Sequence, residues 1–130
     1  MARDMIGDFL TIIRNGIMAS LPSVDAPHSK MRLMIANILK NEGFVRDVVE
    51  HGEGANKIIR VHLKYVDGES AIHEIKRVSR PGGRVYTRIH DVKPVIGGLG
   101  LTILTTSRGV LTNKQAKQAV VGGEVLCTVW

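Results

Sequence analysis

Residues 99–109, LGLTILTTSRG, decide how this sequence is interpreted. Residues 99–103 are apolar and predict a buried strand. Residues 104–109 then add three hydroxyl side chains and the guanidinium of Arg108, and the chain can turn at Gly109. Small hydrogen-bonding groups and an arginine at the end of a buried strand predict close contact with a polar, anionic partner.

The charge of the chain is concentrated in its second half. The chain has 130 residues, of which 44% are hydrophobic and 23% charged, with a formal net charge of +6. Residues 1–75 hold nine Lys and Arg against ten Asp and Glu, whereas residues 76–130 hold nine against two. This asymmetry predicts a polyanionic partner, with nucleic acid first and an anionic membrane second. A solvated basic face that only aids solubility is the alternative.

Composition also limits the class of protein. The single cysteine, Cys127, excludes an internal disulfide and a metal site built on several thiolates, and it indicates a reducing compartment. The five histidines show no metal-ligand spacing, so no metal or other cofactor is predicted. No apolar run approaches the roughly 20 residues of a membrane span, and the first residues lead directly into a helical pattern without a secretory signal.

The hydrophobic pattern predicts an α+β fold in two domains, with a boundary near the Pro81-Gly82-Gly83 interruption. Residues 1–76 are expected to form an N-terminal α/β layer of two helices on a short sheet. Residues 77–130 are expected to form a mainly antiparallel β domain with one short helix. The expected elements are a helix from a capping Asp4 to Met18, a connector over 20–27, a helix over 30–41 capped by Ser29, strands over 44–50, 59–65, 70–78, 84–88, 99–103 and 124–130, a helical turn over 91–96, and a helix over 113–119 behind a Thr112/Gln115 capping box.

Two features that could suggest an enzyme are weak. Residues 97–100, GGLG, lead into a strand, whereas phosphate-binding glycine loops open a helix. Ser107 has no base nearby in the sequence and lacks the Gly-x-Ser-x-Gly pattern of a nucleophile. A small nucleotide- or phosphate-dependent enzyme therefore stays a rival hypothesis, as does a basic adaptor for proteins or membrane surfaces.

Several residues fit RNA binding, each with a plainer alternative. Tyr86 lies between Arg84 and Arg88, as base stacking with phosphate contact would require, but it could also be a core tyrosine. Thr106 and Ser107 carry hydroxyls small enough for the shallow minor groove of RNA, but these could also bond within a turn.

Two cations lie in the first turn of the second expected helix. Lys30 and Arg32 stand where the helix dipole disfavours positive charge, which suggests an external anion. Two exposed side chains without a role are the alternative.

The C-terminal pattern resembles a known family. LTTSRGVLT at 104–112, GGEVLC at 122–127 and the final Trp130 closely resemble the end of bacterial-type ribosomal protein eight of the small subunit. Further matches to its pattern follow in order along the chain, at residues 12–16, 29–30, 38–44, 76–82 and 84–86.

The resemblance implies a structural protein, not an enzyme, that binds an irregular helix in the central domain of small-subunit ribosomal RNA early in assembly. Its implied partners are that RNA, neighbouring small-subunit ribosomal proteins and, in some bacterial members, the messenger RNA of its own operon, with no membrane. The implied location is the ribosome, in the bacterial cytoplasm or, alternatively, the plastid stroma. Together with the basic residues Arg84 and Lys114, the implied RNA-binding residues are Thr105, Thr106, Ser107, Arg108, Tyr86, Gly122, Gly123, Glu124 and Lys30.

Overall fold

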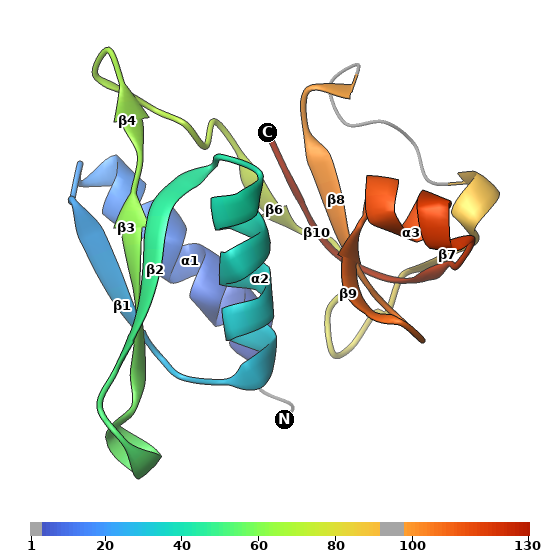
Figure 1. Ribbon diagram of the computed structural model, residues 1–130, viewed down its shortest axis with the longest axis horizontal. Helices are drawn as coiled ribbons and strands as arrows, with labels where there is room; N and C mark the ends of the chain where they lie inside the picture. Colours follow the sequence, from blue (N-terminus) through green and yellow to red (C-terminus); the bar gives the residue numbers. More distant parts are fainter. Residues whose placement is uncertain (1–3, 92–97) are drawn as a thin grey trace. The chain divides into compact units, whose positions relative to one another are not determined.

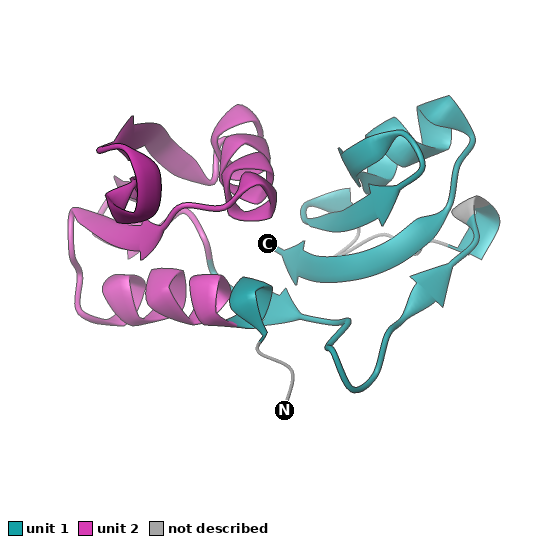
Figure 2. Ribbon diagram, turned by 90° about the horizontal axis from the view of Figure 1, so that it is seen from below, with its two compact units in different colours: residues 1–7, 73–130 teal, residues 8–72 magenta. Residues whose placement is uncertain are grey.

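The computed structural model describes residues 4–91 and 98–130 and contains helices and antiparallel sheets, which confirms the α+β class (Figure 1). The chain divides into two compact units (Figure 2). Unit 1 comprises residues 1–7 and 73–130, and unit 2 comprises residues 8–72. The predicted boundary between domains at 76/77 stays a prediction about how the chain folds.

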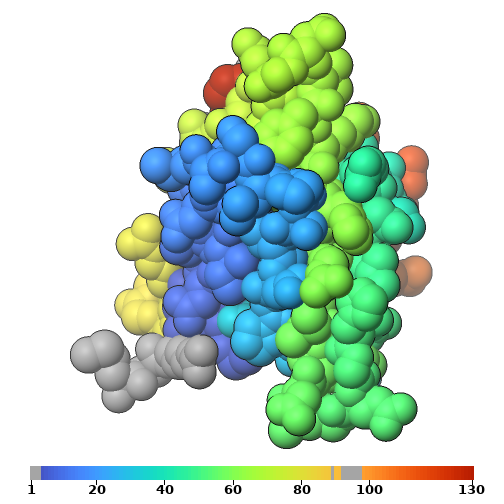
Figure 3. All heavy atoms as spheres, turned by 90° about the vertical axis from the view of Figure 1, so that its left-hand side faces the viewer, coloured from blue at the N-terminus to red at the C-terminus, as the bar shows by residue number. Residues whose placement is uncertain are grey.

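Unit 2 is built on a three-stranded antiparallel sheet of order β1-β3-β2. Its β1 corrects the prediction of a connector over 20–27, because Ser23–Pro27 pairs with β3 along its whole length. Pro22 precedes this edge strand and Pro27 is its last residue, and proline is tolerated at both places, so these residues do not exclude a strand. β1 lies along the face of this unit seen in Figure 3, in blue. The elements are α1 Met5–Met18, of which residues 5–7 belong to unit 1, β1 Ser23–Pro27, α2 Lys30–Asn41, β2 Val45–His51, a 3-10 turn Gly54–Asn56, β3 Ile58–Leu63, β4 Tyr65–Val66 and β5 Glu69–Ser70.

Both long helices begin where their capping residues predict. The Asp4 carboxylate accepts a hydrogen bond from the backbone N–H of Gly7 at 2.9 Å, and the Ser29 hydroxyl accepts one from that of Arg32 at 3.1 Å. These bonds satisfy N–H groups that lack helical partners. The predicted starts and ends of α1 and α2 are therefore confirmed.

Arg32 overturns one expectation about the first turn of α2. Its side chain is buried with 1% exposure, and its Nη1 donates to the carbonyl of Pro27 at 2.9 Å. The structure thus uses Arg32 inside unit 2, and the prediction that it meets an external anion is wrong. Lys30 is exposed at the start of the same helix, so its part in RNA binding stays a prediction.

Unit 1 is built on a sheet of order β6-β10-β8-β9, with β7 paired to the start of β10. Leu104, Ala116 and Val125 form a buried cluster between this sheet and the short helix. The expected strand over 70–78 is interrupted, and only its two ends pair. The elements are β6 Ile75–Arg77, β7 Tyr86–Thr87, a 3-10 turn Ile89–Asp91, β8 Leu101–Thr106, β9 Gly109–Thr112, α3 Asn113–Ala119 and β10 Gly123–Val129.

The structure around β8 differs from the prediction where the strand begins. Leu99 is 82% exposed, so the buried strand begins two residues later than predicted, at Leu101. The expected helical turn over 91–96 and part of the glycine loop fall on residues 92–97, outside the described residues. The Thr112/Gln115 capping box is confirmed, with both reciprocal hydrogen bonds present at 3.2 and 3.0 Å.

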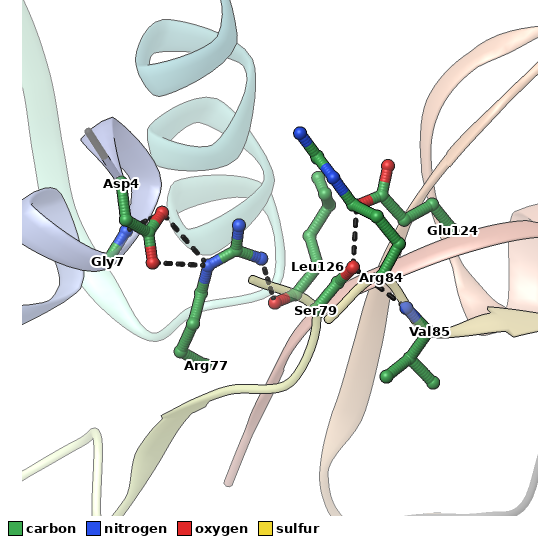
Figure 4. A network of polar contacts seen from close by, with 8 residues as sticks. All are labelled: Asp4, Gly7, Arg77, Ser79, Arg84, Val85, Glu124 and Leu126. Atoms are coloured by element: carbon green, nitrogen blue, oxygen red, sulfur yellow. Dashed lines mark hydrogen bonds and ion pairs between the residues drawn. The ribbon is translucent and has the colours of Figure 1, made fainter. Parts of the chain in front are cut away.

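A β-bulge in β10 explains an unusual run of burial. The register with β8 shifts between Val125 and Cys127, so Leu126 has no residue opposite it, and all three side chains are buried. The carbonyl of Leu126 accepts hydrogen bonds from the backbone N–H of Val78 at 3.0 Å and from Nη1 of Arg77 at 2.7 Å. The nearby Arg77 Nε lies 3.3 Å from the carboxylate of Asp4 (Figure 4). Arg77 therefore connects the bulge to the capping residue of α1.

Candidate nucleic-acid interface

The sheet register brings the predicted site residues of unit 1 together at one end of four strands. Glu124 of β10 pairs with Tyr86 of β7 on one side and with Thr105 of β8 on the other. Side chains directly opposite one another in antiparallel strands share a face of the sheet. We call this region the strand-end surface; it comprises Arg84, Tyr86, Thr87, Thr105, Thr106, Ser107, Arg108, Gly109, Gly123 and Glu124.

The β8–β9 turn uses one of its hydroxyls internally. The Thr106 hydroxyl donates to the carbonyl of Gly109 at 2.8 Å and accepts from the backbone N–H of Arg108 at 3.0 Å. Gly109 has φ of 104°, a backbone conformation that glycine tolerates best. The Thr106 hydroxyl therefore does bond within the turn, and its hydroxyl proton is used there. Its contact with RNA stays a prediction. Ser107 and Arg108 are exposed, and their side chains have no partner within residues 4–91 and 98–130.

Tyr86 is 70% exposed, which excludes a core position. Its backbone is held in β7 against β10, so an aromatic ring is presented to solvent from a fixed strand. Adjacent strands lie roughly 4.8 Å apart. Tyr86 and Thr105 flank Glu124 in the register, so their backbones are separated by about 10 Å.

Glu124 and Arg84 form a polar network with a buried serine (Figure 4). The Ser79 hydroxyl donates to Glu124 Oε2 at 2.6 Å and accepts from the backbone N–H of Val85 at 3.0 Å. Arg84 Nη1 donates to the same Oε2 at 3.0 Å. Ser79 was missed in the sequence because its partner lies 45 residues away and no local pattern marks the pair.

The network keeps Glu124 charged. Burial by itself would raise the pKa of this carboxyl, but hydrogen bonds from Ser79 and Arg84 outweigh burial and leave the pKa below its ordinary value of 4.5. The same carboxylate raises the pKa of the Arg84 guanidinium. The strand-end surface therefore contains one fixed negative charge among its cations.

Gly123 is required by close packing. A Cβ at this position would overlap the carbonyl oxygen of Thr105, so the strands approach one another here as only glycine allows. Gly122 directly precedes β10 and is partly buried. Gly123 therefore allows the close approach of β10 to β8, the strand that carries Thr105.

The remaining predicted contacts lie elsewhere. Lys114 is exposed in the first turn of α3, which continues directly from β9, and Lys117 is exposed one turn later. Lys30 belongs to unit 2. Within the described residues, no group of three His, Cys, Asp or Glu side chains could hold a metal ion. None of the helices over these residues is long and apolar enough to cross a membrane.

Comparison with known proteins decides the family. A family model described as ribosomal protein S8 matches residues 4–130. The chain belongs to this family. Small ribosomal subunit protein uS8 of Rubrobacter xylanophilus is 52% identical over 128 residues, which cover 98% of this chain and 97% of that protein. The uS8 proteins of Geobacter metallireducens and Solibacter usitatus are 48% and 49% identical over 98% and 100% of this chain, and over 97% and 100% of their own lengths.

Membership in the S8 family confirms the resemblance seen in the C-terminal pattern. It also confirms that the chain is not an enzyme, because the relatives are named as proteins of the small ribosomal subunit. The glycine-rich residues 97–100 therefore do not indicate nucleotide-dependent catalysis. The residues that contact RNA are a separate matter, and their assignment remains a proposal.

Proposed function

We propose that this chain is an RNA-binding structural component of the small ribosomal subunit, and that its strand-end surface binds an irregular helix in the central domain of small-subunit ribosomal RNA. The single observation that supports this most is an exposed Tyr86 in the same strand array as the exposed Ser107 turn. An aromatic ring stacks on an unpaired base, and a small hydroxyl reaches sugar or base edges in a shallow groove.

The cationic side chains around this surface attract RNA phosphates but do not distinguish one RNA from another. Arg84, Arg108 and Lys114 are exposed in unit 1 and suit contact with phosphates. Phosphate contacts alone bind any RNA and weaken steeply with salt. Selectivity for an irregular helix therefore depends on Tyr86 and Ser107, which can meet unpaired bases and 2′-hydroxyls.

The wider biology follows from the family. As a ribosomal protein, the chain resides in the ribosome. The relatives found are bacterial, which supports the bacterial cytoplasm over the plastid stroma as the place of that ribosome. Its partners are small-subunit ribosomal RNA and neighbouring small-subunit proteins, and it binds the RNA early to nucleate assembly. The same surface would repress translation of its own operon where the messenger RNA presents a similar irregular helix.

The test is affinity for a folded fragment of small-subunit ribosomal RNA against an unrelated duplex of equal length, measured at several salt concentrations. We expect Tyr86→Ala and Ser107→Ala to lower the ratio of the two affinities, Tyr86→Ala by about tenfold, because stacking contributes roughly 1–3 kcal/mol per base. Tyr86→Phe should retain the ratio because it keeps the ring. Lys117→Ala should lower the affinity for both RNAs by the same factor.

Ser20→Ala is the matched control for Ser107→Ala, since Ser20 is an exposed serine of unit 2. It should leave the ratio unchanged. Equal affinity of the unmodified protein for the two RNAs would refute selective binding. Affinity for anionic vesicles as tight as for the folded fragment would favour the membrane adaptor instead.

A further inference from the structure

A carboxylate at the centre of a surface that binds RNA needs an explanation. Glu124 stands between Tyr86 and Thr105 in the strand register, and its side chain keeps 12% exposure. Phosphates carry negative charge, so a carboxylate at this position repels them, and more strongly as water is excluded from the contact. A surface that needed only affinity for RNA would gain by having no acid here.

Hydrogen bonds hold the Glu124 carboxylate in one position. Oε2 accepts hydrogen bonds from both Ser79 and Arg84, and Ser79 is itself fully buried. Ser79 also binds the backbone N–H of Val85, between Arg84 and Tyr86 (Figure 4). The position of Glu124 is thus coupled to the segment that carries both an arginine and the exposed ring. Its Oε1 has no hydrogen-bond partner in the part of the chain that the structure describes.

Arg84 is restrained by the same contact. One of its guanidinium nitrogens, Nη1, is bound to Glu124, while its side chain is 49% exposed. Its remaining N–H groups have no partner within residues 4–91 and 98–130, so they can meet a phosphate in one orientation. An unrestrained arginine side chain can contact phosphates in many positions. A restrained arginine contacts only a phosphate whose position matches its own fixed orientation.

We propose that Glu124, fixed by Ser79, is a specificity-determining residue that excludes phosphate from the centre of the strand-end surface and holds Arg84 at its side. The central position then accepts a hydrogen-bond donor, such as an exocyclic amino group of an unpaired base or a 2′-hydroxyl, which can bind the open Oε1. Discrimination follows if a regular duplex brings a phosphate to this position, where the irregular helix brings the donor. This inference rests on the proposed function.

Glu124→Gln tests the role of the charge, and Glu74→Gln is the matched control because it makes the same change of net charge at an exposed site of unit 1. Affinities are measured for the folded ribosomal RNA fragment and for an unrelated duplex. We expect Glu124→Gln to raise affinity for the unrelated duplex about threefold and to lower the ratio of the two affinities about tenfold. Glu74→Gln should shift both affinities alike and keep the ratio.

Glu124→Asp separates charge from reach. It keeps the negative charge but is too short to hold Ser79 and Arg84 as Glu124 does, so the ratio should fall without a gain for the unrelated duplex. A ratio for Glu124→Gln equal to that for Glu74→Gln overturns the inference. So does an equal loss of affinity for both RNAs, which a purely structural role would produce. If the unmodified protein fails to distinguish the RNAs, the proposed function itself fails, whereas failure of the Glu124 variants alone rejects only this inference.

Discussion

Replacing Asp4 with asparagine is expected to destabilise the protein through Arg77. Asparagine keeps an oxygen that can accept the Gly7 N–H, and it is as good a helix cap as aspartate. The substitution therefore removes the charge and leaves the cap. The Arg77 guanidinium, only 7% exposed, then keeps the Leu126 carbonyl as its uncharged hydrogen-bond partner within the described residues.

The magnitude follows from the burial of the pair. Breaking a fully buried ion pair costs roughly 3–5 kcal/mol because a charge is left uncompensated. The Asp4 side chain is 28% exposed and its contacts to Arg77 are long, at 3.3 Å. Solvent screening therefore reduces the expected loss to about 2 kcal/mol. For a chain of this length that loss lowers the melting temperature by about 7 °C.

Asp25→Asn is the matched control. Asp25 binds Arg60 through two hydrogen bonds of 2.8 and 3.1 Å, which is better geometry than that of Asp4 with Arg77. Both side chains of this pair are well exposed, Asp25 at 45% and Arg60 at 38%. Exposed pairs contribute little because water competes and screens, so we expect a smaller loss despite the shorter bonds.

The assay is urea unfolding followed by far-ultraviolet circular dichroism, with Trp130 fluorescence as a local probe, since Trp130 stacks on His73 within unit 1.

Burial would raise the pKa of Asp4, but the bonds from Gly7 and Arg77 outweigh it and lower the pKa below 3.8. Its contribution is thus complete above its unfolded pKa and is lost as pH falls through the lower folded pKa. The difference between the unmodified protein and Asp4→Asn should therefore shrink below pH 3.8. A loss for Asp25→Asn as large as that for Asp4→Asn would refute this reasoning.

Three further predictions concern other parts of unit 1. Burial raises the pKa of the Cys127 thiol to about 12, so iodoacetamide at neutral pH should label the folded protein far more slowly than the urea-unfolded protein; equal rates would contradict this. Gly123→Ala should lower both the melting temperature and the RNA affinity ratio, whereas Gly82→Ala, where an added Cβ meets nothing within 4 Å, should change neither. Thr112→Val removes the acceptor for the Gln115 N–H and should cost about 1 kcal/mol in urea unfolding; an unchanged unfolding midpoint would show that the cap contributes nothing.

The sequence predicted the local elements well, because their signals are local. The caps at Asp4, Ser29 and Thr112 set helix starts within a few residues of themselves. The Asp67-Gly68 pair forms the turn between β4 and β5 with positive φ at both residues, as its composition indicates. The β8–β9 turn likewise follows from an apolar run that ends in hydroxyls and Gly109.

What the sequence did not predict depends on residues far apart in the chain. β1 forms because β3 offers it a pairing edge, which the prolines obscured. Arg32 is buried because the Pro27 carbonyl lies within reach. The strand-end surface exists because β10 pairs with both β7 and β8, and no periodicity within any of these strands specifies that register. The Thr106 hydroxyl bonds to the carbonyl of Gly109 across the turn, and its contact with RNA stays a prediction.

The central claim about this protein is that the strand-end surface is its RNA-binding surface. The most direct test is a titration of isotopically labelled protein with the folded ribosomal RNA fragment, followed through backbone amide chemical shifts. We expect the largest chemical-shift changes at the amides of Tyr86, Ser107 and Gly123. Changes confined to residues 8–72, with these three amides unmoved, would contradict it.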